Sequence, residues 1–189
     1  MHTHLVAWCL AILNLLVPAA PWSSEFPREA EAFVTAAERD PLFKDKRGVE
    51  ETVDYELSVA FFESMFNPAA IGDKGGSWGL FQVSPPTAAP YAEQARAKRI
   101  AFGDLVDLWR PVGQDLLEPE AAAPLAIKLM KISFQICRDR PREERLGWYA
   151  AGGTGCRGIK ESRHRVGKAQ WLAQAHPFVS ESEEKVAAR

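Results

Sequence analysis

The chain has 189 residues, of which 47% are hydrophobic and 25% charged, and this is the balance of an ordinary globular protein. It has 23 Lys and Arg against 25 Asp and Glu, a net charge of −2, so it lacks the basic excess with which proteins bind nucleic acid. Length and composition together predict one domain and exclude collagenous, coiled-coil and wholly disordered chains.

The amino-terminal segment is the most apolar part of the sequence. Residues 5–17 form an apolar run that only Asn14 interrupts. Val17 and Ala19 then place small residues at positions −3 and −1 of a cleavage site, which predicts a secretory signal peptide over residues 1–19. The run is too short to span a bilayer, so we expect an exported protein, periplasmic or extracellular, without a membrane span after cleavage. Because no Lys or Arg precedes the run, the alternative is a buried core helix or an uncleaved anchor.

The rest of the chain divides into three parts. Residues 20–47 are expected to form a linker, over 23–28, and a first helix. Residues 48–175 form the main domain, and 176–189 a polar tail. Apolar residues at helical spacing, separated by Pro and Gly, predict helices over 29–39, 50–66, 87–101, 119–138, 143–151 and 160–175. With at most a small hairpin between 70 and 84, the predicted fold is mainly α.

Two cysteines remain after the predicted cleavage, because Cys9 is removed with the signal peptide. In an exported protein, Cys137 and Cys156 are expected to form one disulfide. The alternative is two unrelated buried thiols. No His or second Cys stands at ligand spacing from either cysteine, so we expect neither a metal nor a cofactor.

Glu63 is the first residue that points to chemistry. It lies at the flank of the apolar stripe of the predicted helix 50–66 and close to the carboxyl end of that helix. Partial desolvation and the negative end of the helix dipole both disfavour the charged form, so they are expected to raise the pKa of this carboxyl. A carboxyl of this kind can act as a general acid near neutral pH. The alternative is a solvated surface glutamate.

Two further segments carry aromatic side chains beside glycines. The long irregular segment 67–86 holds Trp78 and Phe81, whose flat faces suit sugar rings but could also anchor a core. Tyr149 belongs to a second such segment, 147–152. The glycine spacing is not that of a phosphate-binding loop, because no Gly-Lys-Ser or Gly-Lys-Thr follows.

Together these segments resemble the catalytic domain of the soluble lytic transglycosylases, members of the lysozyme-like superfamily. Glu63-Ser64 followed by Asn67-Pro68 is similar to the first motif of that family, and Gly79-Leu80-Phe81-Gln82 is similar to its Gly-Leu-Met-Gln motif. Tyr149-Ala150-Ala151-Gly152 is similar to its Ala-Tyr-Asn-Ala-Gly motif, with Ala150 where the family has Asn. The resemblance covers about residues 48–175.

The resemblance implies a lysozyme-like fold and cleavage of the peptidoglycan glycan strand between N-acetylmuramic acid and N-acetylglucosamine, with formation of a 1,6-anhydro ring. Glu63 would act first as general acid and then as base. Gln82 and Tyr149 would line the cleft, and Ser64 would orient the acid or contact substrate, unless it only bonds the local backbone. We expect a monomer, and a compact exported domain suits a dedicated partner in a cell-envelope machine.

Two alternatives stay open. A hydrolytic muramidase would need a second carboxylate, and Asp73 is the nearby candidate, although a solvated turn residue is the simpler interpretation. A catalytically weak glycan-binding component of the envelope is the other alternative, which the replacement at Ala150 leaves possible.

Overall fold

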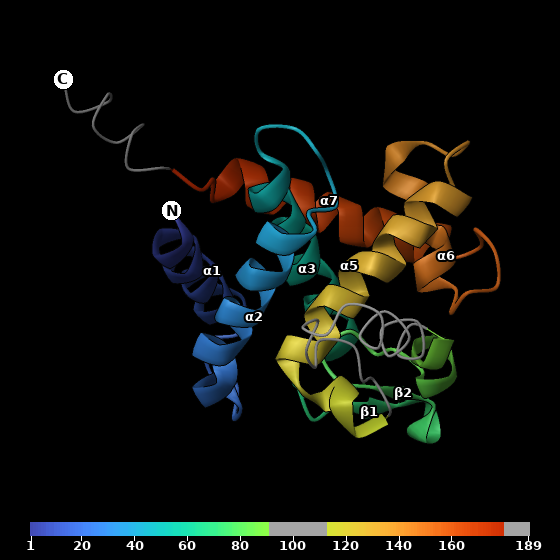
Figure 1. Cartoon of the computed structure of the whole chain (residues 1–189), viewed down its shortest axis with the longest axis horizontal. Coiled ribbons are helices and arrows are strands. Elements are labelled where there is room, and N and C mark those ends of the chain that lie inside the picture. The colour runs from blue at the N-terminus through green and yellow to red at the C-terminus, as the bar shows by residue number, and fades with distance from the viewer. Residues whose placement is uncertain (91–112, 180–189) are drawn as a thin grey trace, which may run out of the picture.

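The computed structural model describes residues 1–90 and 113–179, and this part of the chain is mainly helical, as predicted (Figure 1). Its helices are α1 (His2–Leu16), α2 (Phe26–Arg39), α3 (Gly48–Ser64), α5 (Pro119–Ile136), α6 (Gly147–Ala150) and α7 (Ile159–Ala175). Short 3₁₀ turns are η1 (Ser23–Glu25), η2 (Asp73–Gly75), η3 (Gly113–Leu117) and η4 (Arg142–Glu144). The predicted hairpin is present as β1 (Ile71–Gly72) and β2 (Ser77–Trp78), which pair antiparallel with Ile71 opposite Trp78.

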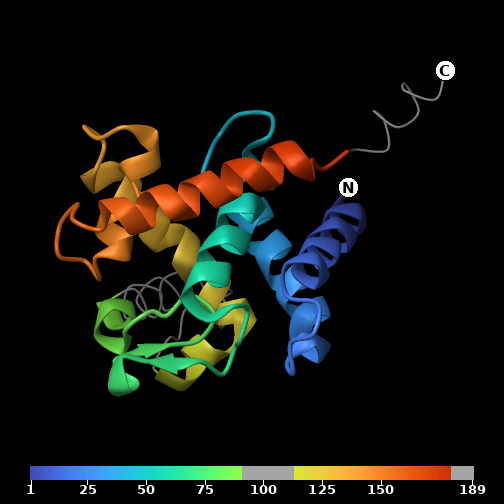
Figure 2. The ribbon, with the colours of Figure 1, turned by 180° about the vertical axis from the view of Figure 1, so that it is seen from behind.

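The helices pack around α3. α2 packs against both α1 and α5, while α3 packs against α2 and α7. α1 and α2 lie side by side at one end of the molecule, and α7 crosses α3 (Figure 1 and Figure 2). This arrangement brings the carboxyl end of α3 close to the hairpin and to the middle of α7.

Large aromatic side chains fill the core between these layers. Phe33 of α2 contacts Phe81, with ring centroids 5.5 Å apart, and both rings are fully buried. Phe26, at the start of α2, packs edge-on against Phe66 at 6.2 Å. Burial of side chains of this size stabilises the fold by roughly 1.5–3 kcal/mol each, so these pairs fix the segment after α3 against α2.

α3 ends two residues earlier than the predicted helix 50–66. Met65 and Phe66 both adopt left-handed backbone conformations, with φ of 53° and 61°. This conformation is unfavourable for residues with a Cβ, but it turns the Phe66 ring into the core, where it is fully buried. The gain from that burial ends the helix at Ser64, before Asn67-Pro68 is reached.

The expected linker 23–28 is wrong, because these residues form η1 and the first turn of α2. Pro27 is tolerated there, since the first turn of a helix needs no hydrogen bond from its backbone nitrogen. The buried Phe26 ring holds this turn on the core.

The other helix predictions differ from the structure mainly at their ends. The ranges 119–138 and 160–175 correspond to α5 and α7, whereas 143–151 is divided between η4 and α6. Residues 85–90 are helical, and the remainder of the predicted helix 87–101 lies outside the described residues.

The predicted signal peptide coincides with α1, which packs on α2. Leu5, Cys9, Ile12 and Leu13 are its buried residues. In the uncut chain this segment is therefore a packed helix, as the core-helix alternative expected, and its cleavage stays a prediction. Among the described residues, no helix is both long enough and apolar enough to cross a membrane.

Candidate active site

Glu63 opens into a cavity of about 260 Å³ at the junction of α3, the hairpin and α6. Leu129 of α5 and the glycine loop after α6 complete its wall. The described residues that line it are Glu63, Asp73, Gly76, Ser77, Gln82, Val83, Ser84, Thr87, Leu129, Trp148, Tyr149, Ala150, Gly152 and Gly153. The cavity thus joins Glu63, Gln82 and Tyr149, which the sequence placed in three separate motifs.

The Glu63 carboxyl is largely buried, with 17% of its side chain exposed. Burial is the main reason why the pKa of Glu63 is raised above its usual range, and the negative charge of Asp73 raises it further. The Arg165 guanidinium opposes both effects and lowers the pKa. The direction agrees with the expectation from the sequence, which rested on desolvation and the helix dipole and did not include Arg165 or Asp73.

Arg165 of α7 contacts Glu63, and the motifs of the sequence did not point to it. Its Nε and Nη2 atoms donate hydrogen bonds of 3.1 and 2.7 Å to the same oxygen, Oε1 of Glu63. A signal for this contact exists in the sequence, because Arg165 stands on the buried stripe of α7 with Ser162, Val166, Ala169 and Leu172. An arginine on such a stripe requires a buried anion as its partner.

Gln82 forms part of the cavity wall and is fixed by the hairpin. Its Nε2 donates to the backbone oxygens of Gly79, at 2.9 Å, and Ala70, at 3.2 Å. The Ser77 hydroxyl lies within hydrogen-bond distance of both Gln82 Oε1, at 2.9 Å, and Asp73 Oδ2, at 3.1 Å. Since a hydroxyl donates one hydrogen, it can satisfy only one of these acceptors at a time.

Gly79 allows the turn that carries Gln82. Its φ of 76° is a conformation that glycine adopts without strain. A Cβ at this position would lie 1.8 Å from the backbone oxygen of Leu116. The close approach therefore explains why the motif containing Gln82 begins with glycine.

Tyr149 reaches the cavity from α6. Its hydroxyl donates a hydrogen bond of 2.8 Å to the backbone oxygen of Phe81, and its backbone nitrogen donates to Ser133 Oγ of α5 at 3.0 Å. Burial raises the pKa of Tyr149 well above its usual range, so the phenol stays neutral and acts as a donor.

Three predicted substrate contacts lie elsewhere. Ser64 Oγ lies within hydrogen-bond distance of the backbone oxygens of Leu80, at 2.8 Å, and Ala60, at 3.2 Å, and donates to one of them, so it bonds the backbone, as its alternative interpretation expected. Phe81 is 1% exposed and belongs to the core. Trp78 packs on the core, and its Nε1 donates to the Gly75 backbone oxygen. None of the three is among the residues that line the cavity, and the sugar-facing role expected of Phe81 is wrong, because its ring is buried.

The predicted disulfide between Cys137 and Cys156 is confirmed, with the two Cα atoms 5.8 Å apart. It joins the end of α5 to the loop that follows α6, so it closes the segment carrying Tyr149. Within the described residues, no group of three or more His, Cys, Asp or Glu side chains could hold a metal ion.

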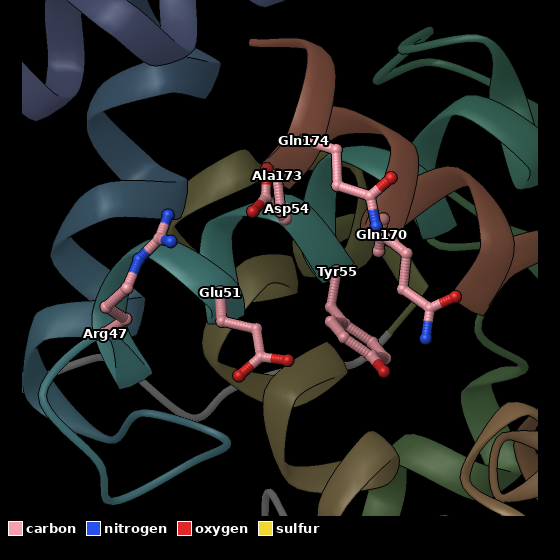
Figure 3. A pocket seen from close by; sticks show the side chains of 8 residues that line it. Arg47, Glu51, Asp54, Tyr55, Gln170, Ala173 and Gln174 are labelled. Atoms are coloured by element: carbon pink, nitrogen blue, oxygen red, sulfur yellow. The ribbon is translucent and has the colours of Figure 1, made fainter. Parts of the chain in front are cut away.

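A second cavity, of about 230 Å³, lies between the first half of α3 and the last turns of α7 (Figure 3). Burial raises the pKa of Asp54, one of its lining residues, to about 8. In Figure 3 the Asp54 carboxylate lies apart from the Glu51 carboxylate and the Tyr55 hydroxyl, and Glu51 is paired with Arg142. These groups therefore do not face one common point, as an acid and its partner would.

Comparison with known proteins gives one family. The family model described as the transglycosylase SLT domain matches residues 44–172, which include α3, the hairpin, α5, α6 and most of α7. No curated protein and no solved structure matches the chain.

Proposed function

The chain belongs to the transglycosylase SLT family, whose lysozyme-like domain acts on peptidoglycan, and from this premise we propose that it is a lytic transglycosylase with Glu63 as its acid and base. The bond cleaved is the β-1,4 bond between N-acetylmuramic acid and N-acetylglucosamine. The product carries a 1,6-anhydromuramyl end.

In the first step, protonated Glu63 gives its proton to the glycosidic oxygen. The bond from this oxygen to C1 of the muramic acid breaks, and the N-acetylglucosamine side leaves with a new hydroxyl. In the second step, the Glu63 carboxylate takes the proton of the C6 hydroxyl of the same muramic acid, and O6 attacks C1. The ring closes, Glu63 is protonated again and no water is consumed.

The observation that carries this proposal is the shared cavity of Glu63, Gln82 and Tyr149. Burial favours the protonated form of Glu63 that the first step requires. The neutral Tyr149 phenol and the braced Gln82 amide supply fixed polar groups beside it. General acid and base action contributes about 10²–10⁴-fold, and the rest of the acceleration must come from substrate distortion and fixed dipoles.

A hydrolytic muramidase is the second candidate, because Asp73 lines the same cavity as Glu63. A hydrolase would use Asp73 to activate water or to form a covalent intermediate. The Ser77 hydroxyl, 3.1 Å from Asp73 Oδ2, would help to orient that carboxylate. This candidate differs from the first in its product, which would carry a reducing muramic acid end.

Mass spectrometry of muropeptides released by the purified protein separates the two candidates. Products 18 mass units lighter than the hydrolysis products, with no reducing muramic acid, support transglycosylation, since the C6 hydroxyl replaces water as the nucleophile. Products with reducing muramic acid ends would instead establish hydrolysis, provided that the Asp73→Asn variant no longer forms them. Absence of any cleavage with retained binding to glycan would support the binding component.

We also propose that residues 1–19 direct the protein to the compartment of its substrate. Peptidoglycan lies outside the cytoplasmic membrane, and the disulfide between Cys137 and Cys156 suits an oxidising compartment. The protein would act on the glycan strand as a monomer. A cell-envelope machine would be its partner and would bring it to the part of the wall that it cleaves.

A further inference from the structure

Arg165 is a buried cation on the packed face of α7. Arg165 as a whole is 8% exposed. Its guanidinium forms an ion pair with the carboxyl of Glu63, whose side chain is 17% exposed. A buried ion pair of this kind contributes little to stability compared with apolar side chains of the same size. Its presence next to the proposed acid therefore calls for a functional explanation.

The position of Arg165 is fixed from two directions. The Ser58 hydroxyl of α3 donates a hydrogen bond of 2.5 Å to the backbone oxygen of Arg165. The guanidinium carbon lies 5.9 Å from the centre of the Phe62 ring, and that ring stacks on His164. α3 therefore holds both the backbone and the side chain of the arginine that contacts its own Glu63.

The contact is one-sided. Nε and Nη2 both donate to Oε1 of Glu63, whereas a parallel bidentate pair would engage both oxygens. Within the described part of the chain, Oε2 accepts no hydrogen bond, and Glu63 lines the cavity. This geometry fixes the carboxyl plane while one oxygen stays free for substrate.

We propose that Arg165 is a positioning residue that anchors Oε1 of Glu63, so that Oε2 alone gives the proton to the glycosidic oxygen and later takes it from the C6 hydroxyl. This inference rests on the proposed function and extends it to a residue outside the three motifs. When Glu63 has lost its proton, the positive charge of Arg165 stabilises the carboxylate that performs the second step.

A pH profile distinguishes this role from simple packing. Three ionisable groups in the described residues face Glu63: Arg165 from α7, Asp73 from η2 and Tyr149 from α6. Only Arg165 lowers the pKa of Glu63. A neighbouring opposite charge shifts a carboxyl by about 1–3 pH units, so Arg165→Met should move the alkaline limb of kcat/KM upward by about that amount. Arg165→Lys should move it less, because the charge remains.

Arg163→Met is the matched control. Arg163 lies on the same helix, two residues away, and pairs with Glu144 instead of Glu63. This variant should leave the alkaline limb where it is in the unchanged protein. A shift of equal size in Arg163→Met would mean that loosening of α7, and not the charge at Glu63, causes the effect.

Carboxyl ¹³C NMR of labelled Glu63 provides a readout that does not depend on activity. The titration of Glu63 should move upward in full-length Arg165→Met, even if the products contradict transglycosylation. An unchanged titration in a variant with native circular dichroism would overturn the proposal. If Arg165→Met does not fold, the same comparison is made with Arg165→Lys, in which an unchanged pH profile and unchanged kcat would equally overturn it.

Discussion

Tyr149 and Phe81 are joined by a hydrogen bond of 2.8 Å between the tyrosine hydroxyl and the backbone oxygen of the phenylalanine. The preceding backbone oxygen, that of Leu80, accepts a hydrogen bond of 2.8 Å from Ser64 Oγ at the end of α3. Two successive carbonyls of the hairpin segment are thus held by α6 and by α3. This arrangement fixes Glu63, Gln82 and Tyr149 relative to one another, although their motifs are distant in the sequence.

Tyr149→Phe removes one of these two links and keeps the ring. We expect a loss of about 1 kcal/mol in the free energy of unfolding, because the Phe81 oxygen loses its partner. We also expect slower cleavage of peptidoglycan, because Tyr149, which lines the same cavity as Glu63, loses the hydrogen bond that fixes its ring. Urea denaturation and a muropeptide release assay measure the two effects. An unchanged free energy of unfolding would mean that the hydrogen bond is not formed in solution.

Glu63→Gln tests the proposed acid and base directly. The amide has nearly the same shape but neither gives nor takes the proton, so we expect the release of muropeptides to fall by about 100-fold or more. Binding to insoluble peptidoglycan in a sedimentation assay should remain. Glu161→Gln, an exposed position in α7, serves as the control and should cleave normally. Unchanged cleavage by Glu63→Gln would remove Glu63 from the mechanism.

The sequence predicted the parts of the site that depend on local pattern. The flank position of Glu63 follows from helical spacing, and the hairpin follows from the glycines of segment 67–86. The disulfide follows from the presence of two cysteines, and all three features are present in the described residues. Each was accessible because helix periodicity, turn chemistry and cysteine pairing are local or countable properties.

Contacts between distant segments were not accessible in the same way. The pair of Arg165 and Glu63 joins residues 102 positions apart, and only the packing of α7 on α3 brings them together. Phe81 illustrates the converse case, since an aromatic side chain in a glycine-rich loop fits either a sugar platform or a core anchor. The choice depends on Phe33 of α2, which occupies the space beside it.

Stability of the full-length chain should fall as the pH rises, because several carboxyls are buried without partners. Glu29 is fully buried, neither of its carboxyl oxygens has a hydrogen-bond partner, and burial raises its pKa from 4.5 to about 8. Between these values the folded state keeps a proton that the unfolded state has lost. The stabilising effect of this proton is complete below pH 4.5 and is lost as the pH rises to about 8.

Glu29→Gln should therefore be more stable than the unchanged protein at pH 9, by about 5 kcal/mol if the whole pKa shift is realised, and should differ little at pH 4.5. Urea denaturation at the two pH values measures the difference. Glu143→Gln, which changes an exposed glutamate, is the control and should follow the unchanged protein at both. If Glu29→Gln is equally stable or less stable at pH 9, Glu29 is not buried as a neutral acid.

The disulfide should stabilise the folded state by lowering the conformational entropy of the unfolded chain. Cys137 and Cys156 are 19 positions apart, and closing a loop of this size contributes about 3 kcal/mol on the chain-entropy model. The double change Cys137→Ser and Cys156→Ser should lower the free energy of unfolding by about that amount. Reduction of the unchanged protein should reproduce the loss and should not affect the double variant. Equal denaturation midpoints with and without reductant would contradict a disulfide in solution.

Cleavage after Ala19 can be tested on the exported protein, although α1 packs on α2 in the uncut chain. The helix buries Leu5, Cys9, Ile12 and Leu13, but most of its other side chains reach the surface. Its removal should therefore cost less stability than the removal of a helix that is buried on all sides. We expect the amino-terminal residue of the exported protein to be Ala20, measured by intact mass. Ala19→Arg should retain the first 19 residues, because a signal peptidase requires a small side chain there. Ala20→Ser, which keeps a small residue beyond the cut, should be processed normally. An exported, active protein that still begins at Met1 would instead make α1 a permanent part of the fold.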